Sequence, residues 1–205
     1  MKVTKAQAQA NRARVVETAA TLFRERGYDG VGVADLMAAA GLTHGGFYKN
    51  FGSKTDLIAE SAACGIAQNA ALSTGADIPE FVQRYLSREH RDGRASGCTI
   101  AALSGDAARQ PEMVRAAFAA GIERLLATLN PASALPDAAD ADAGATRIQH
   151  LAILAQAVGA VVISRACPDD SPLADEILAV CRDRILASLT TPATDAQLGQ
   201  TLEQP

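Results

Sequence analysis

The chain has 205 residues, enough for one medium domain or for a small domain followed by a larger one, and enough to bury an apolar core. Hydrophobic residues make up 48% of it and charged residues 20%, a balance that excludes an intrinsically disordered chain. Forty-four residues are alanine, the best helix former, whereas aromatic residues make up 4% and tryptophan is absent. This composition argues against an all-β protein and predicts a mainly helical one.

The net charge of −4 is unevenly distributed along the chain. Residues 1–56 carry eight basic and five acidic side chains, whereas residues 57–205 carry eleven basic and eighteen acidic ones. A basic N-terminal part on an acidic remainder is typical of a protein that contacts a polyanion locally.

Charged residues are expected to interrupt the apolar stretches well before the roughly 18 residues that span a bilayer, and the polar, basic N-terminus has no signal-peptide core. We therefore expect a cytoplasmic protein without a membrane partner. The cysteines lie far apart and form no CxxC motif: Cys64, Cys98, Cys167 and Cys181. The histidines complete no zinc-binding spacing: His44, His90 and His150. The sequence predicts free thiols, no metal and no cofactor.

Apolar residues at helical spacing predict a first helix over residues 12–26 and a short second helix over residues 33–40. The second helix ends at Gly41, because glycine adopts a left-handed turn at little cost. Thr43 can cap a third helix. Further helices are predicted over residues 53–73, 78–89, 99–109, 112–129, 147–167 and 173–189. Prolines and repeated Asp-Ala pairs predict a flexible acidic loop over residues 130–145.

The second helix, the turn at Gly41 and the third helix form a helix-turn-helix, whose second helix presents its N-terminal side chains to base edges. Because Gly45 and Gly46 have no side chains, the backbone of that helix can approach DNA closely. Tyr48 and Lys49 then offer a phenol and an ammonium group to phosphates. A helix built for stability alone would avoid paired glycines.

The segment Gly41-Leu42-Thr43-His44-Gly45-Gly46-Phe47-Tyr48-Lys49-Asn50-Phe51-Gly52-Ser53-Lys54-Thr55-Asp56-Leu57 resembles the recognition segment of TetR/AcrR-family transcriptional regulators. The resemblance extends back through residues 19–23 and 27–30 and covers roughly residues 10–57. It implies an all-α fold, with a three-helix helix-turn-helix DNA-binding head over residues 1–52. It also implies a larger helical effector-binding and dimerisation body over residues 53–190, and we expect residues 191–205 to form a disordered tail.

The resemblance implies the following DNA-binding residues: Thr43, His44, Gly45, Gly46, Phe47, Tyr48, Lys49 and Lys54. Lys54 opens the next helix, where free N–H groups favour phosphate, although a solvated lysine would also explain it. His44 could contact guanine or phosphate or merely face solvent, and Phe47 is also interpreted as a core residue. Family members usually have Thr or Ser just before the second helix, where this chain has Val31 and Gly32. This chain therefore lacks a side-chain cap for that helix and a hydroxyl contact to phosphate. Operator affinity is expected to be lower than is typical of the family.

The body is expected to bind an unknown small-molecule effector and to dimerise. The candidate effector pocket consists of Ile66, Phe81, Tyr85, Cys98, Leu103, Phe118 and Ile122, although the same residues could form an ordinary core. The candidate dimer interface consists of Leu151, Ala155, Gly159, Leu173, Ile177, Cys181 and Ile185, although burial within one subunit would also explain this pattern.

The resemblance thus implies a homodimeric repressor, not an enzyme, that an effector releases from a palindromic DNA operator by moving the helix over residues 53–73. One alternative is a redox- or electrophile-sensing repressor switched at Cys98, because the segment around Gly97 and Cys98 resembles that of thiol-sensing family members. A buried, inert cysteine is the interpretation favoured for Cys98. Another is a helical protein-interaction module that does not bind DNA. Asp106 and Arg109 lie three residues apart on one predicted helix, and a surface ion pair explains them without a catalytic role.

Overall fold

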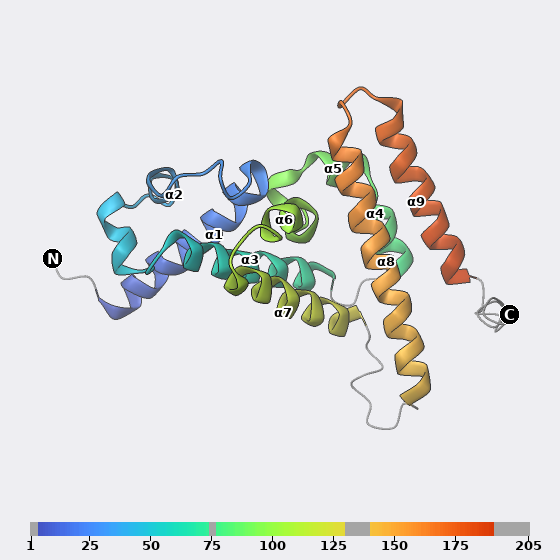
Figure 1. Cartoon of the computed structure of the whole chain (residues 1–205), viewed down its shortest axis with the longest axis horizontal. Coiled ribbons are helices and arrows are strands. Elements are labelled where there is room, and N and C mark those ends of the chain that lie inside the picture. The colour runs from blue at the N-terminus through green and yellow to red at the C-terminus, as the bar shows by residue number, and fades with distance from the viewer. Residues whose placement is uncertain (1–3, 74–76, 130–139, 191–205) are drawn as a thin grey trace, which may run out of the picture.

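The computed structural model describes residues 4–73, 77–129 and 140–190, and all the regular elements in these ranges are helical (Figure 1). The elements are α1 (Lys5–Arg26), α2 (Val33–Ala39), the 3-10 helix η1 (His44–Lys49), α3 (Lys54–Ser73), α4 (Ile78–Tyr85), α5 (Arg88–Asp92), the 3-10 turn η2 (Arg94–Ser96), α6 (Thr99–Ala107), α7 (Glu112–Leu129), α8 (Asp140–Ala166) and α9 (Pro172–Thr190). The all-α fold class is confirmed.

The helix boundaries differ from the prediction at three places. Helix α1 begins earlier, at Lys5, because Thr4 caps it by accepting a hydrogen bond from the Gln7 N–H at 3.1 Å. The predicted helix over residues 78–89 is broken, because Ser87 caps the separate helix α5. Residues 140–145 of the predicted loop are helical within α8. Residues 130–139 and the predicted tail over residues 191–205 lie outside the described residues.

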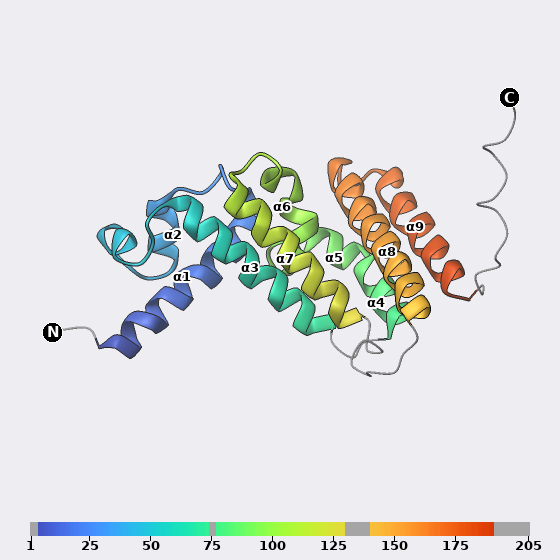
Figure 2. The same ribbon diagram turned by 60° about the horizontal axis from the view of Figure 1, so that its bottom comes forward.

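The N-terminal helices and the first turns of α3 enclose one apolar core. Its buried members include Val15, Ala19, Phe23, Tyr28, Leu36, Met37, Phe47, Phe51 and Leu57. Helix α3 then continues without a break into the rest of the molecule, where it packs against α6 and α7 (Figure 2). The same helix therefore belongs both to the head and to the body.

Two polar side chains tie the head to the body beside α3. Arg24 at the end of α1 is 8% exposed, and its Nε donates a hydrogen bond to the carbonyl of Ala95 at 2.7 Å. On α6, one carboxylate oxygen of Asp106 accepts from the Tyr28 N–H at 3.1 Å while the other accepts from Arg109 at 3.0 Å. The ion pair expected between Asp106 and Arg109 is present, but Asp106 also fixes the turn that follows α1.

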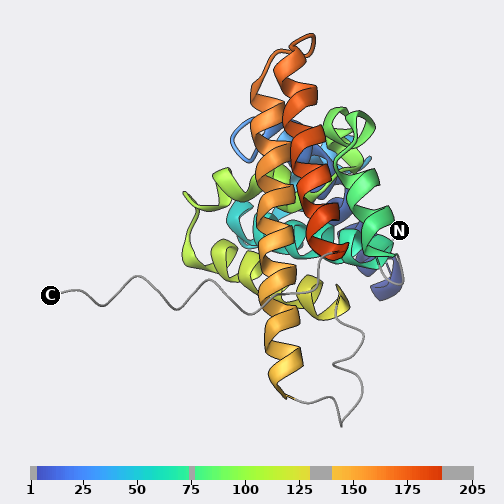
Figure 3. The ribbon, with the colours of Figure 1, turned by 90° about the vertical axis from the view of Figure 1, so that its right-hand side faces the viewer.

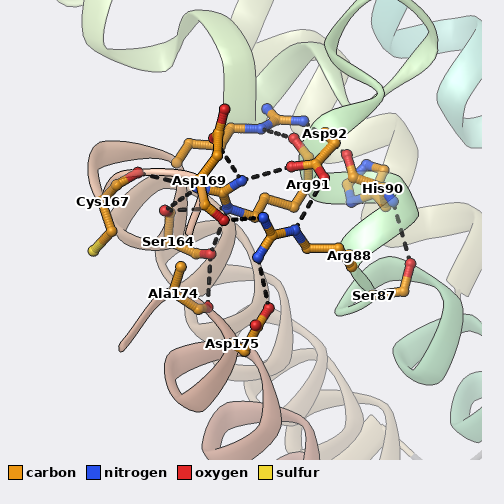
Figure 4. Close-up of polar contacts among 11 residues, drawn as sticks. Ser87, Arg88, His90, Arg91, Asp92, Ser164, Cys167, Asp169, Ala174 and Asp175 are labelled. Atoms are coloured by element: carbon orange, nitrogen blue, oxygen red, sulfur yellow. Dashed lines mark hydrogen bonds and ion pairs between the residues drawn. The ribbon is translucent and has the colours of Figure 1, made fainter. Parts of the chain in front are cut away.

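Arg91 holds α5 against the end of α8 (Figure 4). Its side chain is 2% exposed, and its guanidinium donates to the backbone carbonyls of Ser164 and Cys167 at 3.0 and 3.1 Å. It also donates to the carboxylates of Asp92 and Asp169 at 2.6 and 3.0 Å. Burial acts to lower the pKa of Arg91, but the two carboxylates raise it overall. A buried cation with this many partners stabilises one arrangement of α5 and the α8–α9 turn.

Helices α8 and α9 lie side by side at the end of the molecule away from the head (Figure 3), and none of the other described elements covers their outer face. The expectation that charges break every apolar stretch early is wrong for α8, because Arg147 and Arg165 flank an uncharged run. Residues Gly144–Ala166 are long and apolar enough, by length and composition alone, to cross a membrane. Only 28% of an 18-residue stretch within this range is buried, so α8 presents a large apolar surface.

Gly121 allows α7 to approach α3 closely. A Cβ atom built on Gly121 would lie 2.8 Å from Cδ1, 3.0 Å from Cγ2 and 3.2 Å from Cβ of Ile66. Ile66 is itself buried, at 1% exposure, so it has little room to withdraw.

We predict that Gly121→Ala lowers the free energy of unfolding by about 1 kcal/mol, because overpacking outweighs the gain in helix propensity. Gly105→Ala in α6 is the matched control, since a Cβ there meets nothing within 4 Å. The control should raise stability by about 0.5–1 kcal/mol. Urea unfolding of both variants measures the difference, and equal stabilisation by both would contradict the tight contact.

Candidate nucleic-acid interface

The turn between α2 and η1 is set by Gly41, which has a φ of +69°. The N–H of Gly41 donates to the carbonyl of Ala38 at 3.0 Å, and that of Leu42 donates to the carbonyl of Met37 at 2.8 Å. These two bonds form a Schellman motif, which ends α2 and satisfies its last carbonyls. The turn therefore fixes the angle at which η1 leaves α2.

The second helix of the motif is a 3-10 helix rather than an α-helix over residues 44–49. Thr43 stands at its N-cap in an extended conformation, but its side chain makes no capping hydrogen bond. At the other end, the side-chain amide of Asn50 donates to the carbonyl of Gly46 at 2.8 Å. Since so short a helix has little stability of its own, its position depends on packing against the head.

Phe47 supplies that packing on the inner face of η1. Its side chain is fully buried, and its ring lies 5.1 Å from that of Tyr48 and 5.4 Å from that of Phe51. Arg12 of α1 covers Phe51 at 4.7 Å from the ring centroid, and donates to the carbonyl of Asn50 at 3.3 Å. The structure therefore places Phe47 in the core, and a contact between this side chain and DNA stays a prediction.

Arg12 also joins α1 to α3, because its guanidinium donates to both carboxylate oxygens of Glu60. The hydrogen bonds to Glu60 are the largest cause of its raised pKa. Sequence reasoning did not single out this pair, since the two residues are far apart in the chain.

The outer face of η1 is polar and exposed. Thr43, His44, Gly45, Tyr48 and Lys49 are exposed, and Tyr48 is the most prominent at 68%. The rings of His44 and Tyr48 stand edge to face with centroids 6.4 Å apart. An imidazole, a phenol and an ammonium group are thus presented side by side, a combination suited to phosphate oxygens and base edges.

The two glycines of η1 have different surroundings. A Cβ on Gly46 would lie 3.4 Å from Cε of Met37, so Gly46 packs against α2. A Cβ on Gly45 would meet nothing within 4 Å. Contacts within the described chain therefore do not require glycine at position 45.

Lys54 is half-buried, and its ammonium donates to the carbonyl of Tyr28 and lies 5.9 Å from the ring centroid of Phe23. It ties the start of α3 to the turn after α1. Ser53 caps α3 by accepting from the Asp56 N–H at 3.1 Å. The contact of Lys54 with phosphate stays a prediction, and it would compete with the bond to Tyr28.

At the start of α2, Gly32 is the N-cap and makes no side-chain capping bond. Asp35 satisfies the N–H of Gly32 at 3.2 Å. The hydroxyl that relatives are expected to offer to DNA at this position is absent here.

The structure brings only part of the predicted effector set together. Phe81 and Tyr85 of α4 line an apolar pocket, whose other walls come from α7 and α8. The remaining five residues do not line it: Ile66, Leu103, Phe118 and Cys98 are buried in the core, and Ile122 packs against that core. His150 lines the pocket and was missed as a pocket residue, although a single histidine within an apolar helix was a visible signal.

Cys98 is the N-cap of α6 and is 6% exposed. Its N–H donates to Nε2 of His90 at 3.2 Å, while Nδ1 of the same ring lies 2.7 Å from the carbonyl of Tyr85. His90 is therefore neutral with its proton on Nδ1, and burial lowers its pKa. Cys98, Cys64, Cys167 and Cys181 are all free thiols.

The predicted dimer residues differ in how far they are exposed. Leu151, Ala155 and Leu173 are exposed, and Gly159, Ile177 and Cys181 are half-buried. Ile185 is 1% exposed and belongs to the subunit's own core. The exposed apolar face also contains large residues that were not singled out: Ile148, Val162, Ile163 and Val180.

Among the residues that the structure describes, no group of three or more His, Cys, Asp or Glu side chains could hold a metal ion.

Comparison with known proteins shows what the head is similar to. The family model described as "Bacterial regulatory proteins, tetR family" matches residues 15–61. An HTH-type transcriptional regulator of Mycobacterium tuberculosis is 29% identical over 197 residues, which cover 88% of this chain and 97% of the relative.

Two solved structures resemble the whole chain. A TetR transcriptional regulator from Chloroflexus aurantiacus has a TM-score of 0.65 and 26% identity, covering 90% of this chain and 96% of that one. The reduced form of NemR from Escherichia coli has a TM-score of 0.70 and 21% identity, covering 90% of this chain and 100% of its own. At 21% identity, the likeness to NemR shows a similar fold and nothing more.

We predict that Gly45→Ala leaves the free energy of unfolding unchanged or slightly raised, yet weakens binding to duplex DNA at least about tenfold. The reason is that the new methyl group meets no atom of the protein but would stand between η1 and the groove. Fluorescence anisotropy with a labelled duplex measures the affinity, with Gly105→Ala as control. An unchanged affinity would show that the backbone of η1 does not approach DNA at Gly45.

Proposed function

We propose that this chain is a DNA-binding transcriptional regulator of the tetR family of bacterial regulatory proteins, and that it acts as a cytoplasmic homodimeric repressor. In this proposal a small-molecule effector releases the dimer from a palindromic operator. The family is regulatory rather than enzymatic. The observation that carries the proposal is the exposed polar face of η1, held in place from inside by Phe47.

The two η1 helices of a dimer would enter successive major grooves, about 34–36 Å apart. Thr43 and His44 lie at the N-terminal end, which faces base edges in this type of motif, whereas Tyr48 and Lys49 lie further along and suit phosphates. Because Gly32 offers no hydroxyl, the proposed interface has one phosphate contact fewer than the family pattern provides. We therefore expect an operator affinity lower than is typical of the family.

We predict that Lys49→Ala weakens binding to every duplex by a similar factor and reduces the slope of log K against log salt concentration by about one. Arg26→Ala is the matched control, since it removes one exposed cation from the end of α1 next to the body. Titration against the upstream intergenic DNA and an unrelated duplex measures both quantities. An equal effect of the two substitutions would show that Lys49 contributes only net charge.

The apolar outer face of α8 and α9 supports dimerisation. Ile148 is 71% exposed, Ile163 57%, Val180 54% and Leu173 52%, which is unusual for large apolar residues on a monomer. Ala155 and Gly159 lie between them on α8, and their small size would let a partner helix come close. A second copy related by a two-fold axis would cover the same face on both subunits. A partner subunit over this face would also account for the low burial of the apolar stretch in α8.

We predict that Ile163→Asp raises the dissociation constant of the dimer at least about 100-fold, because dimerisation would bury an unpaired carboxylate. Met113→Asp is the control, because Met113 is 48% exposed but lies on α7, outside this face. Sedimentation velocity over a range of protein concentrations separates monomer from dimer. A dimer that survives Ile163→Asp would place the interface elsewhere.

Effector release would act through α3, which begins in the head and ends in the body. The thiol switch at Cys98 is the second candidate, and the position of this residue at the N-cap of α6 favours it. Its burial argues against ready access by an oxidant, so we give the effector priority. The interpretation as a protein-interaction module without DNA binding is set aside because of the family membership.

A further inference from the structure

An apolar pocket is lined by residues of α4, α7 and α8, helices that come together at the end of the body away from the head (Figures 1 and 2). The space enclosed between its walls is small, about 20 Å³, so a ligand larger than a water molecule has to part them. It is lined by Ile78, Phe81, Tyr85, Leu125, Leu129, His150, Ile153, Leu154 and Ala157. None of these side chains carries a fixed charge, and Phe81 and Tyr85 pair with ring centroids 5.3 Å apart along one wall.

His150 is the exception to the apolar lining. It is 6% exposed, and its Nδ1 has no hydrogen-bond partner among the described residues. A buried polar atom without a partner is costly, so Nδ1 is a place where a ligand would gain by supplying one. Burial lowers the pKa of His150, so the ring is neutral and can either donate or accept one hydrogen bond.

The hydroxyl of Tyr85 is also buried, and among the described residues its one neighbour for a hydrogen bond is the thiol of Cys98, at a geometry too poor for a regular bond. Burial is the largest cause of its raised pKa, and the next causes come from Cys98, which does not line the pocket. We therefore assign the ring of Tyr85 to the pocket wall and its hydroxyl to the neighbouring cluster around Cys98. His150 remains as the polar group available to a ligand.

We propose that this pocket binds an uncharged, mainly apolar, ring-containing molecule with one hydroxyl group, which hydrogen-bonds to Nδ1 of His150. The inference rests on the proposed effector function and names its site and ligand class. A hydroxyl suits either tautomer of the ring, because it both donates and accepts. A carboxylate or ammonium ligand would be disfavoured, since the lining residues offer no opposite charge to compensate for its desolvation.

The pocket is connected to the head through α7. Leu125 and Leu129 form its α7 wall, and Gly121, one turn earlier on the same helix, lies against Ile66 of α3. A ligand that pushes α7 outward therefore changes the contact that positions α3. Since α3 carries the head, the spacing of the two η1 helices would change with it.

The test uses three probes of similar shape on the purified full-length protein: 4-propylphenol, propylbenzene and 4-propylbenzoate. Calorimetric titration should show binding of 4-propylphenol about three- to tenfold tighter than propylbenzene, and about 100-fold tighter than 4-propylbenzoate. The chain has only three histidines, so ¹⁵N labelling of histidine resolves each ring. Nδ1 of His150 should shift on binding the phenol, while the exposed His44 and the hydrogen-bonded His90 should not.

His150→Phe should remain folded, because it replaces a buried unpartnered group with an apolar ring, and should bind propylbenzene and the phenol equally. Tyr85→Phe is the matched control, which removes a buried hydroxyl and leaves the pocket wall, and it should keep the preference for the phenol. The inference is overturned if no probe binds, if 4-propylbenzoate binds best, or if Tyr85→Phe rather than His150→Phe removes the preference.

A separate readout distinguishes this inference from the proposed function. Binding of 4-propylphenol with a shift at His150 but without loss of operator DNA would support the pocket assignment and contradict effector release through it. Release of operator DNA by 4-propylphenol that persists in His150→Phe with unchanged potency would support the repressor function and overturn the role of His150.

Discussion

The structure depends on the continuity of α3 through one apolar core that extends from the head into the body. Leu57 and Ile58 near its start are buried in the part of this core that lies in the head, whereas Ile66 and Ala70 are buried in the part that lies in the body. An α-helix transmits a displacement along its axis because its backbone hydrogen bonds resist bending and stretching. The start of α3 is held by the cap at Ser53 and by Lys54, and its second half is held by α7 at Gly121. The head therefore has no position independent of the body.

Arg24 and Asp106 add a second connection beside that helix. Arg24 reaches from α1 to the segment before α6, and Asp106 reaches from α6 to the turn after α1. Both are side-chain to backbone hydrogen bonds, which depend steeply on distance and angle. A motion of α3 relative to α6 would have to break or rearrange them. They make the junction suited to two discrete arrangements rather than to gradual bending.

The two ends of the molecule have opposite surface chemistry. At the head, a short helix exposes an imidazole, a phenol and an ammonium group, while Phe47 anchors it from below. At the far end, α8 and α9 expose large apolar side chains such as Ile163 and Val180. In the proposed dimer, this separation would let one chain bind DNA at one end and pair with a second copy at the other. The geometry between the two ends would then set the spacing of the two heads.

The sequence alone determined the features that local interactions decide. The helix over α7, the turn at Gly41, the cap at Ser53 and the recognition segment could all be predicted, because each depends on residues within one or two turns of one another. The extent of η1 could not, since a 3-10 geometry there depends on how Phe47 packs into the head.

Only the tertiary structure decided which apolar face of α8 and α9 is buried, because both helices are apolar on more than one side and periodicity cannot choose between the faces. Ile185 thus belongs to the core while Ile163 is exposed. The same holds for the pocket, where His150 meets Phe81 from a helix far away in sequence. Long-range contacts of this kind are decided by the packing of whole helices, a property that no local pattern contains.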